Sequence, residues 1–286
     1  MLRRSLRLLA ATLLLAGCAA PGSPKSSGTV ENFPPTAEVQ SLHLPFDAYT
    51  LSLAEMYTVA NAQDWLTRDC MVTRHYDWKI IDRPTNLKDL RNRRRYGVIE
   101  PDIAQRYGYH VPAGLLTPLA VDQTSDRRDN SLNETQKEVA YGDGGCARAA
   151  VAQLRLPESP DLALLGRLDH ESLDHAQTDS GVAPAMRSWR DCIRQMGFEY
   201  QSPFAAMSDP AWWADDTAPA SSREIAVAVA DVSCKERTGL VAAWYAAEVR
   251  IQEAAIKKYP AKFDQLRAAV LNEVAGANAV LAQKDR

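Results

Sequence analysis

Apolar residues recur at spacings of three and four along most of the chain, the period of an amphipathic helix. The last third is the clearest case, because Leu240, Trp244, Ala247, Ile251 and Ala255 form one such series. Breaks at Thr238-Gly239 and Tyr259-Pro260 divide this part into predicted helices over residues 223–235, 239–258 and 261–281. We expect the last two to form an antiparallel helical hairpin.

The same pattern predicts helices through most of the remaining chain. They cover residues 51–66 and on towards Cys70, 100–107, 131–141, 147–156, 159–173 and 185–196. Only residues 111–119 favour extended structure, so residues 83–128 form the irregular part. The fold class predicted from this pattern is all-α.

One short motif occurs twice. Arg68-Asp69-Cys70-Met71, followed by His75-Tyr76-Asp77-Trp78, aligns without a gap with Arg190-Asp191-Cys192-Ile193, followed by Gly197-Phe198-Glu199-Tyr200. Each copy ends a predicted helix, and Gly197 stands where a helix C-cap is expected. We therefore predict two similar helical halves, residues 46–157 and 158–286, with the irregular segment in the first.

The N-terminus has the pattern of an export signal. Three arginines precede the apolar residues 8–15, and small residues follow. Leu15-Ala16-Gly17-Cys18 resembles the lipobox of bacterial lipoproteins. This resemblance implies that residues 1–17 are a signal peptide and that Cys18 carries the lipid that anchors the protein outside the cytoplasm. The alternative is a plain secretory signal with a cysteine at the cleavage site.

Residues 18–45 are rich in Pro, Gly and Ser and have no apolar period, so we predict a flexible, lipid-anchored tether. The other four cysteines are Cys70, Cys146, Cys192 and Cys234. Outside the cytosol an even set is best interpreted as two disulfide bonds. If the halves are similar, each repeated cysteine pairs with the next one downstream, giving Cys70–Cys146 and Cys192–Cys234.

Composition and charge exclude several classes of protein. With 46% hydrophobic and 24% charged residues the chain is neither disordered nor a multi-span membrane protein. The net charge is −3, and removing residues 1–17 with their three arginines leaves −6. An acidic chain gives no support to nucleic-acid binding.

The irregular region holds the candidate contact residues. A basic run stands out against the acidic chain, and three tyrosines and a histidine follow it; together they are Arg91, Arg93, Arg94, Arg95, Tyr96, Tyr107, Tyr109 and His110. Arginine side chains suit phosphate, so wall polymer or anionic lipid headgroups are possible ligands. The alternatives are a solvated charge run and tyrosines at the edge of a core.

Beyond the lipobox, the chain resembles secreted proteins and lipoproteins of actinobacteria of unknown function. The residues that carry the resemblance are Cys70-Met71, Cys192-Ile193, Arg94-Arg95-Tyr96-Gly97, Arg106-Tyr107-Gly108-Tyr109-His110 and Ala230-Asp231-Val232-x-Cys234-Lys235. The resemblance implies an actinobacterial envelope and transfers no catalytic residue.

Searches for catalytic patterns find no nucleophile elbow, phosphate loop or dinucleotide-binding fingerprint. His170 and His175 are five positions apart, whereas a helical zinc motif needs four, so we predict no metal site and no cofactor. We expect a non-catalytic binding or interaction module in the cell envelope. The alternatives are an enzyme acting on cell-wall material and an accessory subunit of a membrane transporter or sensor.

Overall fold

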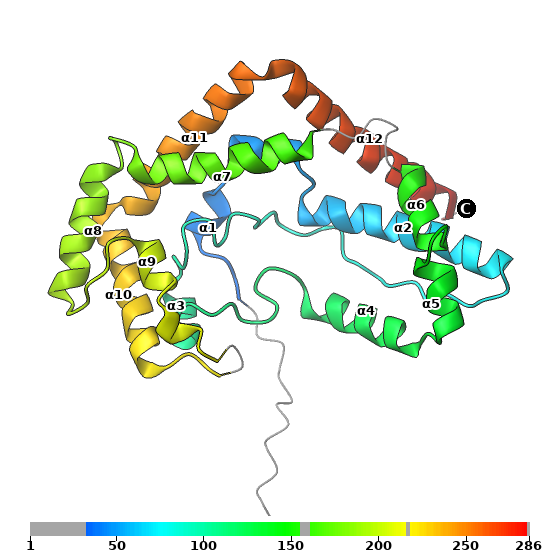
Figure 1. Cartoon of the computed structure of the whole chain (residues 1–286), viewed down its shortest axis with the longest axis horizontal. Coiled ribbons are helices and arrows are strands. Elements are labelled where there is room, and N and C mark those ends of the chain that lie inside the picture. The colour runs from blue at the N-terminus through cyan, green and yellow to red at the C-terminus, as the bar shows by residue number, and fades with distance from the viewer. Residues whose placement is uncertain (1–32, 155–160, 216–217, 285–286) are drawn as a thin grey trace, which may run out of the picture. The chain divides into compact units, whose positions relative to one another are not determined.

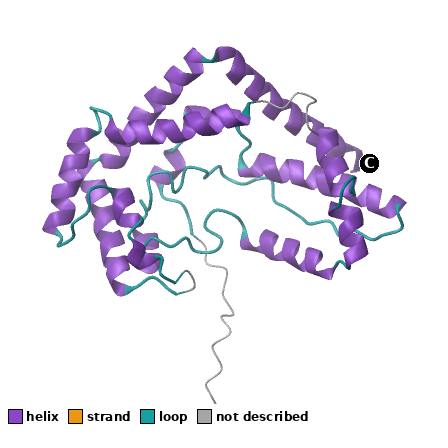
Figure 2. Ribbon diagram, in the orientation of Figure 1, coloured by secondary structure: helices purple, strands orange, loops and turns teal. Residues whose placement is uncertain are grey.

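The helices predicted from the apolar spacing form an all-α structure in the computed structural model, which describes residues 33–154, 161–215 and 218–284 (Figure 1). Within these ranges helices are joined by loops and no strand occurs (Figure 2). Residues 32–286 cluster as one unit. No helix in the described ranges is long and apolar enough to cross a membrane.

The helices keep the order that the sequence predicts. Their bounds are α1 Ala37–Ser41, η1 Pro45–Tyr49, α2 Leu53–Thr73, α3 Pro101–Tyr107, α4 Leu119–Ser131, α5 Glu134–Tyr141, α6 Cys146–Leu154, α7 Leu162–Thr178, α8 Ala183–Gln195, α9 Pro203–Met207, η2 Pro210–Trp212, α10 Ser222–Thr238, α11 Leu240–Lys258 and α12 Pro260–Lys284.

Local sequence explains where several of these helices begin and end. Ser52 caps α2, where its side chain and that of Glu55 form a reciprocal capping box. Asp161 and Ser221 each accept a hydrogen bond from the third residue beyond them, at the starts of α7 and α10. Gly239 takes the left-handed conformation that separates α10 from α11, as its position predicts.

The two copies of the repeated motif end their helices in the same way. The Tyr76 amide donates to the Met71 carbonyl at 2.9 Å, and the aligned Phe198 amide donates to the Ile193 carbonyl at 3.1 Å. His75 and Gly197, also aligned, both have a positive φ, at 65° and 88°. This is the Schellman ending of a helix, and it occurs at the predicted position in both copies.

The predicted disulfide pairing is confirmed. Cys70 bonds Cys146, which joins the end of α2 to the start of α6. Cys192 bonds Cys234, which joins α8 to α10.

The packing of α11 and α12 corrects the predicted hairpin. The two helices meet at Tyr259-Pro260, but α11 lies mainly along α7 and α12 mainly along α2 (Figure 1). Ala277 of α12 is fully buried with Val59 and Ala62 of α2 and Leu154 of α6. Each helix therefore covers its apolar stripe against a different partner.

The cores also cross the predicted boundary between residues 157 and 158. The largest cluster combines Val39, Tyr96, Val98 and Tyr109 from the first part with Trp189, Val227 and Trp244 from the second. A smaller one combines Phe46 with Leu165 and Phe263. These clusters combine residues of both predicted halves, whereas two smaller ones, which include Met71 with Trp78 and Tyr57 with Ile81, lie within the first half.

Two further expectations need correction. Residues 119–131 form α4 although the sequence predicts no helix there, and an ion pair of 2.7 Å between Arg128 and Asp64 attaches α4 to α2.

Of the predicted tether, residues 18–32 lie outside the described residues, whereas residues 33–45 belong to the folded unit. Val39, Leu42 and Leu44 are buried in or beside α1, so they contribute to the core.

Candidate functional site

Arg93, at the centre of the predicted basic patch, lies inside the fold. Its side chain is 2% exposed, and it donates to both oxygens of the Glu100 carboxylate at 2.7 and 2.9 Å. The same guanidinium donates to the backbone carbonyls of Leu115 at 3.3 Å and Phe33 at 3.0 Å. The positive charge of Arg93 is therefore neutralised by Glu100 inside the fold. Its guanidinium also links the backbone at Phe33, where the folded unit begins, to the backbone at Leu115.

Arg95 and Tyr96 join in a second buried network. Arg95 bonds the fully buried carboxylate of Glu248 on α11 and the partly exposed one of Asp169 on α7. The Tyr96 hydroxyl donates to the other oxygen of Glu248 at 2.8 Å. Burial first, then the adjacent Glu248, raises the pKa of Tyr96, so the phenol stays protonated.

Arg91 and Arg94 also bind within the fold. Arg94 donates to the Tyr109 carbonyl at 2.7 Å, and burial lowers its pKa. Arg91 bonds Asp89 and reaches the Asp47 carbonyl at 3.1 Å. The structure thus corrects both interpretations of this run: Arg93, Arg94 and Arg95 form neither an exposed anion-binding patch nor a solvated charge run.

The physical reason is that residues 90–100 and 108–115, on either side of α3, run through the core without regular helical structure. A buried irregular backbone has polar groups that helices do not satisfy, so side chains must supply partners. Lys235 on α10 donates to the Val98 carbonyl at 2.8 Å. Glu224, also on α10, accepts from the Tyr109 amide at 2.9 Å.

Asp231 and Lys235 form a fully buried ion pair on α10 at 2.9 Å. Asp231 also accepts from the indole of Trp189 at 3.0 Å and the hydroxyl of Tyr109 at 3.4 Å. Burial disfavours both charged forms, so it raises the pKa of Asp231 and lowers the pKa of Lys235. The hydrogen bonds that Asp231 accepts from Lys235, Trp189 and Tyr109 stabilise its charged form and partly offset this rise in its pKa.

His110 is held in the arrangement of an acid–histidine dyad. Its Nδ1 lies 2.8 Å from Glu224 Oε1, and its ring stacks on that of Trp213 with centroids 4.7 Å apart. The other nitrogen, Nε2, is buried and has no hydrogen-bond partner among the described residues. A carboxylate that orients an imidazole is the geometry of a general base, but a buried Nε2 is closed to a substrate in this conformation.

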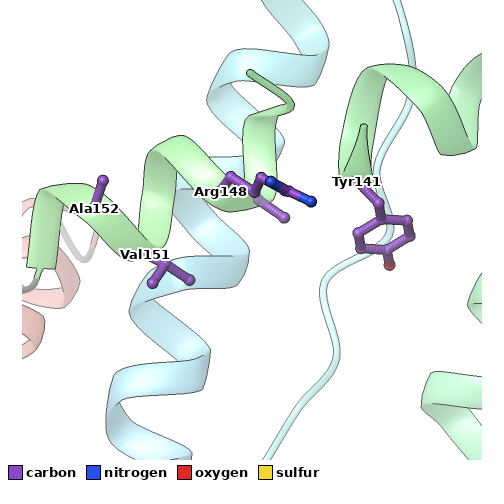
Figure 3. Close-up of a pocket in the computed structure, with 5 residues that line it drawn as sticks. Tyr141, Arg148, Val151 and Ala152 are labelled. Atoms are coloured by element: carbon purple, nitrogen blue, oxygen red, sulfur yellow. The ribbon is translucent and has the colours of Figure 1, made fainter. Parts of the chain in front are cut away.

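The surface recess between α5 and α6 is open and mainly apolar. It has a volume of about 490 Å³ and lies where α5 meets α6; its lining is Tyr141, Ala147, Arg148, Val151 and Ala152 (Figure 3). Arg148 is exposed and pairs with the exposed Asp143 at 3.1 Å. The Cys70–Cys146 disulfide secures the start of α6 beside it. Such a surface suits an apolar group with an anionic end.

Two other recesses contain more polar groups. One, of about 300 Å³, has two acids, Glu100 and Asp102, in its lining. Both oxygens of Glu100 accept from Arg93, so this carboxylate is already bound within the fold. The other, of about 330 Å³, lies between α7 and α11 and includes Glu171, Ser172 and His175.

The histidines of α7 do not converge. His170 is exposed and pairs with Asp174, one helical turn away, at 3.3 Å. Glu171 pairs with Arg167 at 3.5 Å. Among the described residues no group of three or more His, Cys, Asp or Glu side chains is placed to hold a metal ion.

No protein-family model, curated protein or solved structure matches the chain. Three residues that organise the core were not singled out by the sequence analysis, namely Asp64, Glu224 and Glu248. Asp231 and Lys235 were named there only as carriers of the resemblance, although their spacing of four among apolar residues of one helix is itself a signal for a buried pair. Glu248 had no local signal, since its partner Arg95 is 153 positions away.

Proposed function

We propose that the protein is a lipid-anchored component of the cell envelope that acts by binding a partner on the outer side of the membrane. The anchor is supported by the lipobox Leu15-Ala16-Gly17-Cys18 and the charged and apolar segments before it. Two disulfide bonds in the folded unit support an oxidising compartment.

The proposed tether can include only residues 18–32, which lie outside the described residues, because Phe33 already belongs to the folded unit. A flexible chain of this length has a root-mean-square reach of roughly 20 Å. The folded unit then stays close to the bilayer, where it meets membrane proteins, headgroups and the inner layers of the wall.

Binding is favoured over catalysis by how the polar side chains of residues 91–110 are used. Arg93, Arg95 and Tyr96 have their partners inside the fold, and so do the carboxyl groups of Glu100 and Glu248. The open recess at α5 and α6 is the observation that carries the proposal, because it combines apolar lining with one exposed arginine. Wall polymer and anionic headgroups contacted through Arg93–Arg95 are no longer supported as ligands.

In-cell photo-crosslinking tests this proposal. A photoreactive amino acid at Ala152, which lines the recess, should capture a partner. The matched control is Gln153, which is exposed on the same helix but does not line the recess. A defined partner from position 152 and none from position 153 is the expected result. Equal capture from both positions, or none from either, would contradict a binding role for the recess.

A further inference from the structure

We infer that the folded unit docks on the bilayer surface through an apolar patch made of Phe33, Tyr107, His110, Val111 and Trp213. This inference rests on the proposed lipid anchor at Cys18. It adds a second contact with the membrane, made by side chains of the folded unit.

The entry point of the tether locates this patch. Phe33 is the first described residue, 15 positions after Cys18 (33 − 18 = 15). Arg93 holds its carbonyl at 3.0 Å, and its ring meets the edge of the Tyr107 ring at 5.6 Å and 77°. The tether therefore joins the folded unit beside the C-terminal end of α3.

The patch continues from Tyr107 to the loop before α10. The His110 amide donates to the Tyr107 carbonyl at 3.0 Å, and the His110 and Trp213 rings lie 4.7 Å apart at a tilt of 36°. Trp213 is 40% exposed and Val111 is 52% exposed. α10 contacts both α3 and α9 in the fold (Figure 1).

The chemistry of the patch suits a membrane interface. Tryptophan favours the headgroup level because its ring is apolar and its N–H is polar. The Trp213 N–H is bonded to the Met207 carbonyl at 3.0 Å, so burying this indole in lipid leaves no donor unpaired. Arg106 is exposed on α3, with its guanidinium 5.4 Å from the Tyr107 ring centroid, near where headgroup phosphates would lie.

With a short tether, a patch of low intrinsic affinity is enough to keep the folded unit on the bilayer. A lipid chain at one end of about 15 residues holds the patch at a high effective concentration near the bilayer, so a few apolar contacts can keep it bound.

Tryptophan fluorescence of the full-length lipidated protein in vesicles of brominated phospholipid provides the test. Of the six tryptophans only Trp213 is exposed. The wild type should lose part of its emission, up to about the share of one tryptophan in six. Trp213→Phe should abolish this loss, whereas Trp65→Phe, at a half-buried position on α2, should retain it.

A second pair of variants leaves every tryptophan in place. Val111→Asp should reduce the quenching of Trp213, and Val72→Asp should not, although the two valines are equally exposed at 52% and 53%. Mass spectrometry of the N-terminal peptide of the same sample shows whether Cys18 is acylated. Acylated protein without quenching, or with quenching unchanged in Trp213→Phe, overturns the docking patch and leaves the anchor standing. A non-acylated Cys18 overturns the anchor, and docking with it.

Discussion

At the scale of single residues, Glu248 has the most concentrated set of buried polar contacts. Its carboxylate accepts from Arg95, from the Tyr96 hydroxyl at 2.8 Å and from Ser172 at 3.0 Å, and it is fully buried on α11. Gln252, one turn later, is also fully buried and donates to Ser172 at 3.0 Å. These contacts hold the irregular segment between α7 and α11.

Glu248→Gln should lower the free energy of unfolding by about 3 kcal/mol, because it removes the buried partner of Arg95 and leaves that guanidinium with only the partly exposed Asp169. A neutral amide also accepts the hydrogen bonds of Tyr96 and Ser172 less well than the carboxylate does. Asp169→Asn is the matched control, since it removes the second carboxylate that Arg95 binds, at a partly exposed position. Its cost should be about 0–1 kcal/mol. Urea denaturation followed by circular dichroism measures both. Similar losses in the two variants would contradict the central role of Glu248.

The sequence predicted least well which partners the individual arginine side chains bind. Three consecutive arginines suggested an exposed patch, because this basic run stands out against an acidic chain. Their partners are Glu100 for Arg93 and Glu248 for Arg95, and the second comes from 153 positions away. Only the fold brings such residues together.

At the scale of elements, the ends of α2 and α8 show that one local motif builds the same structure twice. Both helices end in a residue with positive φ after the repeated cysteine, and both cysteines bond to a later helix. The first copy uses His75 where the second uses Gly197. A non-glycine residue pays a steric cost in this conformation that glycine does not.

His75→Gly should therefore raise the free energy of unfolding by up to about 1 kcal/mol, and Gly197→Ala should lower it by about 1 kcal/mol. The His75 side chain is exposed, so few contacts are lost. A Cβ at residue 197 would meet no atom within 4 Å, so the cost there is conformational. Thermal unfolding of the two variants checks the opposite signs; changes of the same sign would contradict the shared ending.

Elements were predicted where an apolar stripe or a cap was present in the sequence. Helices α2, α7, α10, α11 and α12 have such signals. Helix α4 has apolar residues only at its start, and Arg128 attaches it to Asp64, which also binds Trp78 and Arg83. The hairpin prediction failed because the stripes on α11 and α12 are each complementary to a helix far away in sequence, α7 and α2.

At the scale of the whole molecule, the fold class and the disulfide pairing followed from sequence. The apolar period predicts the helices, and the motif repeated at Cys70 and Cys192 predicts which cysteines pair; both are local patterns in the sequence. The sharing of cores between residues 33–154 and 161–284 depends on which helix faces meet, and the repeat does not encode this.

The central claim is that the protein is exported, cleaved before Cys18, lipidated there and oxidised to two disulfide bonds. The intact mass of protein extracted from membranes, after alkylation of free thiols without prior reduction, tests all four steps together. We predict a chain that begins at Cys18, carries at least two acyl chains and contains no alkylated cysteine. A chain that begins at Met1, without lipid and with five alkylated cysteines, would contradict the account.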